Sequence, residues 1–219
     1  MHRHRNTQRQ PECKGIKGAE VDDKFHKKVQ QTANINIHND LDSAALFFAQ
    51  MAAEKAADPA KRDGLTFVCM AAGVMMAFSF EAYLNFMGAK YVGLWNEWDE
   101  YHKKIDKVFQ HLKIRPDWSK RPYSSISAMK RLRNTLAHGK PEKVEVEKDI
   151  VDKANGEKGK KLDLSGDWER LCSPDMIAHA HEDLETVWKE MIQKSGIDVM
   201  ELITSGDGAV IIGKKFELP

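Results

Sequence analysis

The sequence is poor in the features that usually assign a chain to a secreted or metal-binding class. It has three cysteines, Cys13, Cys69 and Cys172, an odd number without CxxC spacing. This pattern argues against a disulfide framework and a zinc knuckle, and it predicts a reducing, cytoplasmic location. Net charge is also small, because 34 basic residues nearly balance 33 acidic ones, for a formal charge of +1. Binding of a nucleic acid would therefore need a local basic patch.

Long apolar runs and targeting signals are missing as well. The start of the chain, residues 1–5, is basic, but no apolar h-region follows it, so we find no secretory signal. The most apolar run, residues 65–80, is shorter than the roughly 20 residues that span a membrane. We expect this run to be a buried central helix, and we expect no membrane contact.

Patterns typical of metal sites and phosphate loops are missing too. His179 and His181 would lie about 200° apart around a helix, so they cannot share one metal ion. Gly206-Asp207-Gly208 indicates a turn and not a phosphate loop, because no GK[ST] follows it. We therefore expect no bound metal and no cofactor.

What the sequence does contain is the composition of an ordinary globular protein. Hydrophobic residues make up 42% of the 219 positions and charged residues 31%, which suits one sizeable core. Residues 1–38 differ, since they are polar and locally basic. We predict a disordered tail there, with a short helix near residues 21–31. A solvated tail is the favoured interpretation, and an RNA-contacting arm is the alternative.

Hydrophobic periodicity predicts five helices, at about residues 40–57, 60–87 or 65–87, 94–112, 124–138 and 174–195. The second helix is apolar nearly all round, which is typical of a helix buried on most sides. Gly73 predicts a close helix crossing within it, and Gly88 predicts its end. Trp95 and Trp98 follow the spacing of an amphipathic face, so we expect both to be core anchors of the third helix.

Two stretches have strand character. Within residues 142–165, polar and apolar residues alternate on both sides of Asn155-Gly156, which predicts a β-hairpin insertion. A mobile insertion is the alternative. The tail, residues 197–219, contains two apolar segments that suit a small terminal hairpin. The predicted fold class is therefore mainly α: a bundle of four to five helices over residues 39–196, with a small β-hairpin insertion and a flexible N-terminal tail. Active sites in such bundles are usually built from side chains on facing helices.

The fourth helix, about residues 124–138, combines positive charge with titratable chemistry and ends at Gly139. At 100° per residue its buried stripe is formed by Ile126, Met129, Leu132 and Leu136. Arg133 lies beside that stripe, and Asn134 and His138 lie about 40° apart further around the helix. Arg133 and His138 are about 140° apart. They flank one surface and converge only if the helix end bends or a second subunit completes the site.

The segment 118–141 carries basic residues and no acidic residue. Such a basic patch is typical of a surface that binds a phosphate backbone. We predict that four of its cations contact RNA: Lys130, Arg131, Lys140 and Arg121. Glu81 and Asn85 are the polar exceptions near the end of the apolar second helix, and we predict that they support Arg133. The alternative is that they only mark a partly exposed helix end.

The segment Arg133–His138, RNTLAH, resembles the Arg-x(4–6)-His motif of the HEPN superfamily, in the form with a polar residue after the arginine. Residues 80–85, FEAYLN, also resemble that superfamily, and the resemblance covers about residues 40–141. It implies a small all-helical domain that forms a homodimer. Many such domains are metal-independent ribonucleases of toxin–antitoxin or phage-defence systems, so RNA and an antitoxin or other protein are the implied partners.

By this resemblance Arg133 and His138 are the catalytic pair, with Asn134 as their polar companion. An imidazole, which titrates near neutral pH, takes the proton of a ribose 2′-hydroxyl. The oxygen then attacks the adjacent phosphorus, giving a 2′,3′-cyclic phosphate and a 5′-hydroxyl, while the guanidinium stabilises the charge of the transition state. In a two-fold dimer the acid and the base come from different chains.

A non-catalytic interpretation stays open beside the enzyme. Many members of the superfamily keep the fold and the motif but serve as helical modules for dimerisation or for binding a nucleic acid, nucleotide or protein. Arg133 would then pair with Glu81 inside the bundle, and His138 would only interact favourably with the dipole at the helix end. The sequence therefore predicts either a ribonuclease or such a module.

Overall fold

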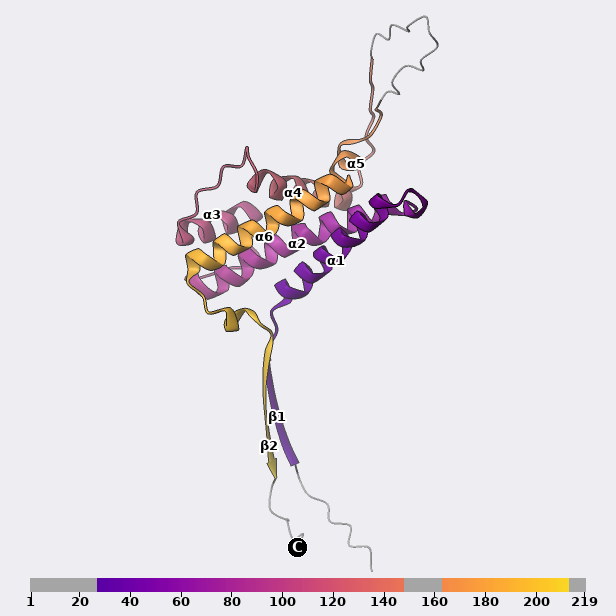
Figure 1. The fold of residues 1–219 in the computed structure, drawn as a ribbon. Helices are drawn as coiled ribbons and strands as arrows, with labels where there is room; N and C mark the ends of the chain where they lie inside the picture. The colour runs from indigo at the N-terminus through magenta and orange to yellow at the C-terminus, as the bar shows by residue number, and fades with distance from the viewer. Residues whose placement is uncertain (1–26, 148–162, 213–219) are drawn as a thin grey trace, which may run out of the picture. The chain divides into compact units, whose positions relative to one another are not determined.

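The computed structural model describes residues 27–147 and 163–212 of the chain. It contains a helical bundle, residues 34–205, and a pair of strands, which are two separate compact units (Figure 1). The bundle consists of α1 (Ile37–Ala57), η1 (Pro59–Lys61), α2 (Leu65–Tyr91), α3 (Tyr101–Leu112), α4 (Tyr123–His138), α5 (Asp167–Leu171), α6 (Pro174–Ser195) and η2 (Val199–Leu202). The mainly helical fold predicted from the sequence is confirmed.

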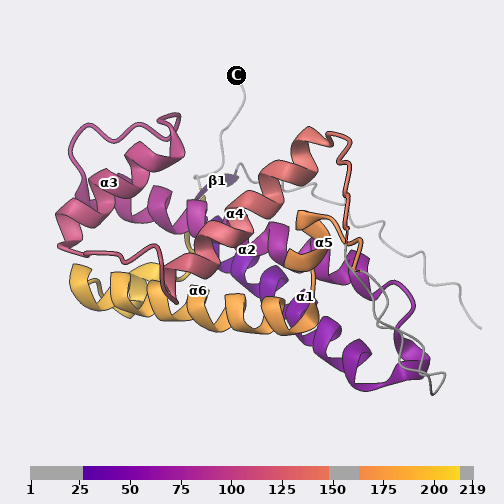
Figure 2. The ribbon, with the colours of Figure 1, turned by 90° about the horizontal axis from the view of Figure 1, so that it is seen from above.

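α2 is the central helix of the bundle. It packs against α1, α3, α4 and α6, and Figure 2 shows α4 crossing over it. Its fully buried side chains include Phe80, Tyr83, Leu84 and Met87. Burying an apolar side chain of this size stabilises a fold by about 1.5–3 kcal/mol. By length and composition alone α2 is also able to cross a membrane, a test that the core helix of a soluble protein passes as well.

The predicted close crossing at Gly73 is confirmed. Gly73 lies where α2 meets α4, and a Cβ atom there would be 2.5 Å from Leu132 Cδ2 and 3.2 Å from Met129 Sδ. The two helices therefore approach each other this closely only because the position has no side chain. The packing outweighs the helix propensity of glycine, which is about 1 kcal/mol less favourable than that of alanine.

The predicted end of α2 at Gly88 is wrong, because the helix continues to Tyr91. Gly88 is buried inside the helix, and a Cβ atom there would be 2.4 Å from ring atoms of Trp95. Glycine is needed here for the close approach of an indole ring and not for a left-handed helix end. In a sequence, a glycine near the end of an apolar segment is equally compatible with the end of a helix and with a close contact inside a helix.

The third helix is shorter than predicted, since α3 begins only at Tyr101. The preceding segment turns around Asn96, whose Oδ1 accepts a hydrogen bond from the Trp98 N–H at 3.1 Å. Local bonds of this kind compete with the helix for backbone groups. Trp95 packs against the core as predicted. Trp98 is 86% exposed, so the prediction that it is a core anchor is wrong.

The predicted ends of α4 and α6 are confirmed. Each helix is followed by a glycine in the left-handed region, Gly139 with φ 53° and Gly196 with φ 65°. The N–H of each glycine donates back to a carbonyl of the last helical turn. At the start of α6, Ser173 Oγ accepts a hydrogen bond from the Met176 N–H at 3.3 Å.

The two strands, β1 (Lys27–Asn34) and β2 (Ser205–Ile212), form an antiparallel sheet. The sequence predicts a tail up to residue 38 with a short helix near residues 21–31, whereas the structure has a strand at residues 27–34. The terminal hairpin is also corrected, because β2 pairs with β1 and not with residues 199–203. Strand pairing between distant segments leaves no local signal in either one.

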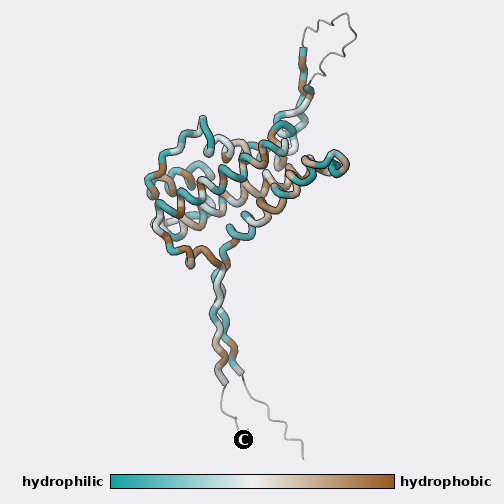
Figure 3. Tube along the Cα trace, in the orientation of Figure 1, coloured by the Kyte–Doolittle hydropathy of each residue, from teal (hydrophilic) through white to brown (hydrophobic). Residues whose placement is uncertain are grey.

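The segment after α6 forms the 3₁₀ turn η2 in place of the predicted strand. Asp198 caps this turn, accepting a hydrogen bond from the Met200 N–H at 2.9 Å. Val199, Met200 and Ile203 are exposed, and Figure 3 shows the segment that follows the last helix of the bundle as apolar. The apolar residues that suggested a strand therefore lie at an exposed turn.

Most of the predicted hairpin insertion lies outside the described residues. The structure describes its first part, residues 142–147, which has no regular secondary structure. Glu142 Oε1 accepts a hydrogen bond from the Asp167 N–H at 3.3 Å. This contact ties the start of the insertion to the first residue of α5.

His38 on α1 is a buried polar side chain among aromatic rings. It is 2% exposed, and its ring centroid lies 4.4 Å from that of Phe86 and 5.3 Å from that of Trp188. Its Nε2 has no hydrogen-bond partner in the part of the chain that the structure describes. Burial lowers the pKa of His38, and the carboxylates of Asp42 and Asp40 oppose this effect only in part.

We predict that Gly73→Ala lowers the free energy of unfolding by about 1–3 kcal/mol, because the added methyl group displaces Leu132 on α4. Urea unfolding followed by circular dichroism measures this difference. Gly93→Ala is the control with little expected change, since a Cβ atom there would meet no atom within 4 Å. Equal stability of Gly73→Ala and the wild type would contradict the tight crossing.

We predict that the free energy of unfolding falls as the pH drops below about 6.5, where the unfolded chain protonates His38 and the folded chain, with its lowered pKa, does not. One such group contributes a slope of at most about 1.4 kcal/mol per pH unit. Urea unfolding at several pH values should show a weaker dependence in His38→Phe. The exposed control His102→Gln should keep the wild-type dependence, and an unchanged slope in His38→Phe would exclude His38 as its source.

Candidate functional site

α4 presents the predicted motif in a regular helix. Its buried residues are Tyr123, Ser125, Ile126, Met129 and Leu132. They include most of the stripe predicted from the sequence, and Leu136 packs partly buried against the core. The helix is regular up to His138, so its end does not bend inward before Gly139. Arg133 and His138 therefore stay on different sides of α4.

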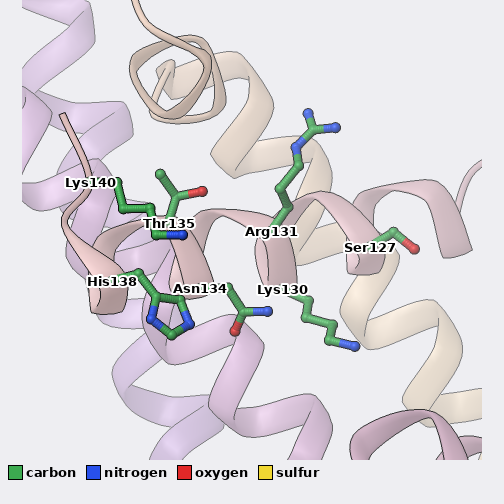
Figure 4. A pocket seen from close by; sticks show the side chains of 7 residues that line it. All are labelled: Ser127, Lys130, Arg131, Asn134, Thr135, His138 and Lys140. Carbon is green, nitrogen blue, oxygen red and sulfur yellow. The ribbon is translucent and has the colours of Figure 1, made fainter. Parts of the chain in front are cut away.

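His138 and Asn134 line an open pocket of about 420 Å³ on α4. The other lining residues are Ser127, Lys130, Arg131, Thr135 and Lys140. Figure 4 shows Lys130, Asn134 and His138 on the same side of the helix, with Arg131 and Thr135 on the other. His138 is exposed and Asn134 is half-buried. The pocket thus brings together most of the residues predicted to cleave or bind RNA.

Arg133 does not line that pocket, because it faces α2. Its Nη2 donates a hydrogen bond to Glu81 Oε2 at 2.9 Å, and its guanidinium carbon lies 5.6 Å from the centroid of the Phe78 ring. The side chain is 27% exposed, so the ion pair is less screened by water than a surface pair. The buried Nε of Arg133 has no hydrogen-bond partner among the described residues.

The Glu81 carboxylate is shared by two cations. Its Oε2 accepts from Arg133, and its Oε1 accepts from Lys104 Nζ at 2.9 Å. Lys104 belongs to α3 and its side chain is 4% exposed, so the ammonium depends on Glu81 to compensate for the loss of water. The contact with Arg133 is the one predicted for Glu81. Through these three side chains α2, α3 and α4 are joined.

A third cation, Lys130, lies over Tyr101, with Nζ 3.9 Å from the ring centroid. Burial lowers the pKa of Lys130, the charge of Arg133 adds to this effect and Glu81 opposes it. Burial also raises the pKa of Tyr101, with Glu81 adding to the effect and Arg133 opposing it. The buried Tyr101 hydroxyl lacks a hydrogen-bond partner within the described ranges. The junction of α2, α3 and α4 therefore holds three cations around one carboxylate.

Two of the predicted site residues lie outside these groups. Asn85 has a buried Oδ1 that makes no hydrogen bond to any described residue. Arg121 Nε donates to Asp183 Oδ2 at 2.7 Å, and its Nη2 donates to Glu182 at 3.2 Å. Asp183 raises the pKa of Arg121 and also accepts a hydrogen bond from Ser125. Arg121 therefore joins the start of α4 to α6 and does not face the pocket.

Lys104 and Tyr101 take part in this arrangement, but our sequence analysis missed them. At 100° per residue, Lys104 falls near the apolar face of α3, which is formed by Ile105, Val108, Phe109 and Leu112. A lysine at a core position is rarely buried without a partner. This position indicates an acidic partner, but the sequence does not identify it, because Glu81 lies on another helix.

Comparison of the chain with family models, curated proteins and solved structures finds no match. Among residues 27–147 and 163–212, no group of three or more His, Cys, Asp or Glu is arranged to hold a metal ion. The chemistry available at α4 is therefore argued from its own side chains. An exposed imidazole and a fixed guanidinium on a basic surface suit proton transfer and the binding of anions.

We predict that Asp183→Ala lowers the free energy of unfolding by about 1–3 kcal/mol, because the buried Ser125 hydroxyl loses its partner and α4 loses a contact with α6. Urea unfolding measures the effect. Glu182→Ala is the matched control with little expected change, since that side chain is 69% exposed. Equal losses in the two variants would contradict the structural role of Asp183.

Proposed function

We propose that this protein is a metal-independent endoribonuclease of HEPN type that works as a homodimer in the cytoplasm. The observation that carries the proposal is the pocket on α4 in which a histidine lies among basic side chains. His138 and Asn134 line an open pocket among basic side chains, while Arg133 on the same helix is held by Glu81 at 2.9 Å. A proton acceptor, a fixed cation and a basic surface are the parts that RNA cleavage without a metal needs.

In the proposed reaction, side chains of the protein itself accept and donate the protons. His138 of one subunit accepts the proton of a ribose 2′-hydroxyl, and the 2′-oxygen forms a bond to the adjacent phosphorus. The bond from phosphorus to the 5′-oxygen breaks, and that oxygen takes a proton from the histidine of the second subunit. Arg133 stabilises the negative charge that develops on the phosphate oxygens. The products are a 2′,3′-cyclic phosphate and a 5′-hydroxyl.

A second subunit is part of the proposal because Arg133 and His138 of one chain lie on different sides of a regular helix. Two copies of α4 facing each other across a two-fold axis would form one cleft. The surface beside Arg133 suits such a contact, since Phe78 on α2, whose ring lies 5.6 Å from the Arg133 guanidinium, is 38% exposed. Exposed apolar side chains of this size favour an interface between proteins.

We predict that the wild-type protein cleaves mixed RNA in the presence of EDTA and that His138→Ala lowers the rate about 10²–10⁴-fold, the contribution of a general acid–base group. Gel analysis of labelled RNA measures the rate, and the upstream fragments should carry a 2′,3′-cyclic phosphate at their 3′ ends. The exposed His102→Ala is the control that should keep full activity. If wild type and His138→Ala leave the same RNA profile, the protein is not this enzyme.

The shared cleft can be tested with the same inactive variant. After subunit exchange, an equal amount of His138→Ala protein should reduce the activity of a fixed amount of wild type by about half, because half of the wild-type chains then sit in mixed dimers. Activity that does not change on mixing would show that each subunit acts alone.

The second candidate is a non-catalytic HEPN-like module that dimerises or binds a nucleic acid, nucleotide or protein partner such as an antitoxin. The observation that favours it is that Arg133 faces Glu81 and does not line the pocket with His138. In that case Arg133→Ala should unfold or dissociate the protein, which circular dichroism and size-exclusion chromatography detect. A stable, dimeric Arg133→Ala protein without ribonuclease activity would favour the enzyme.

A further inference from the structure

Lys104 places a buried ammonium at a core position of α3. Its side chain is 4% exposed, and its Nζ is paired with Glu81 Oε1 at 2.9 Å. The neighbouring side chains of Ile105 and Val108 are apolar and buried. A methionine would fill a similar space without removing a charge from water, and buried ion pairs are often no more stabilising than apolar packing. Stability alone therefore does not account for a lysine here.

The two carboxylate oxygens of Glu81 bind different cations, and this arrangement indicates the role of Lys104. Lys104 occupies Oε1, and Arg133 reaches only Oε2, through the single nitrogen Nη2. An arginine and a carboxylate frequently pair through two parallel hydrogen bonds, which use one whole edge of the guanidinium. With Lys104 paired to Oε1, Arg133 makes one hydrogen bond to Glu81 in place of two. The Nε–H group of Arg133 is buried and donates a hydrogen bond to none of the described residues.

The charges at the junction support the same role. Glu81 and Arg133 alone would form a neutral pair, but Lys104 leaves this group with one net positive charge. Lys130 brings a second positive charge beside it, over the ring of Tyr101. An anion that approaches this junction therefore meets two cations, the partly exposed guanidinium of Arg133 and the ammonium of Lys130.

We propose that Lys104 is a positioning residue: by pairing with Glu81 Oε1 it holds Arg133 in place without neutralising it, so that Arg133, with Lys130, binds one phosphate of an RNA backbone. The identity of the polynucleotide rests on the proposed function. A phosphodiester suits the junction because its oxygens accept charge-assisted hydrogen bonds from a guanidinium and an ammonium together.

The test measures binding of a fluorescent 2′-O-methyl RNA oligonucleotide, which lacks the 2′-hydroxyl nucleophile and so is not cleaved. Lys104→Met should weaken binding about tenfold and reduce the slope of log Kd against log salt concentration by about 1, the contribution of one phosphate contact. Lys103→Met is the matched control, because it removes the same charge from α3 at a side chain that is 55% exposed. Lys104→Arg, which keeps a cation beside Glu81, should restore most of the affinity.

Coupling to Glu81 separates positioning from a merely structural role. In a Glu81→Gln background Arg133 has no carboxylate to close on, and Lys104 has no carboxylate oxygen to share with it. Lys104→Met should then weaken binding no more than Lys103→Met does. The same loss in both backgrounds would overturn the positioning role, whether or not thermal unfolding shows a change in stability. Retention of full affinity in Arg133→Ala would overturn the phosphate site itself.

The inference and the proposed function fail in different ways. A wild-type protein that binds the oligonucleotide with this pattern but leaves RNA intact overturns the ribonuclease and supports the phosphate site. A wild-type protein that does not bind the oligonucleotide overturns the phosphate site.

Discussion

The burial of α2 between α1, α3, α4 and α6 is the constraint on which the other contacts depend. A helix packed on so many sides admits close neighbours only where it has no side chain, and Gly73 and Gly88 are such positions. The same packing partly buries the Glu81 side chain, which is 27% exposed. A carboxylate in such a place needs cations, and α3 and α4 supply them as Lys104 and Arg133. The polar junction at the centre of the candidate site is thus a consequence of how the core is packed.

The candidate site combines one rigid and one accessible part on a single helix. Arg133 is fixed by its contact with α2. The proposed ribonuclease needs such a fixed cation, because reorienting it during the reaction would raise the barrier. His138 and Asn134 border an open pocket, which the proposed polymeric substrate would have to reach. Lys130 is common to both parts, since it lines the pocket and also lies over Tyr101. A phosphate chain that follows Lys130 would pass from one part to the other.

Charge patterning predicted a basic surface on α4 but did not distinguish its members. Arg121 and Arg131 were equivalent in the sequence, yet Arg121 is bound to Asp183 on α6 and Arg131 lines the pocket. A segment without acidic residues shows only that its basic residues have no acidic partner nearby in the sequence. It does not show whether an acidic partner lies on another helix. Trp95 and Trp98 differ for a similar reason, because a turn at Asn96 interrupts the helical spacing that made them equivalent.

The sequence by itself determined the features that depend on neighbouring residues: the ends of α4 and α6, the buried stripe of α4 and the burial of α2. Capping bonds and helical periodicity act within one or a few turns, so a local pattern records them. Only the tertiary structure decided that β1 pairs with β2 and that Glu81 is shared by Lys104 and Arg133. Such contacts join residues far apart in the chain. Such a contact stabilises the fold only after the intervening loop has closed. The residues next to either partner in the sequence therefore do not indicate the other partner.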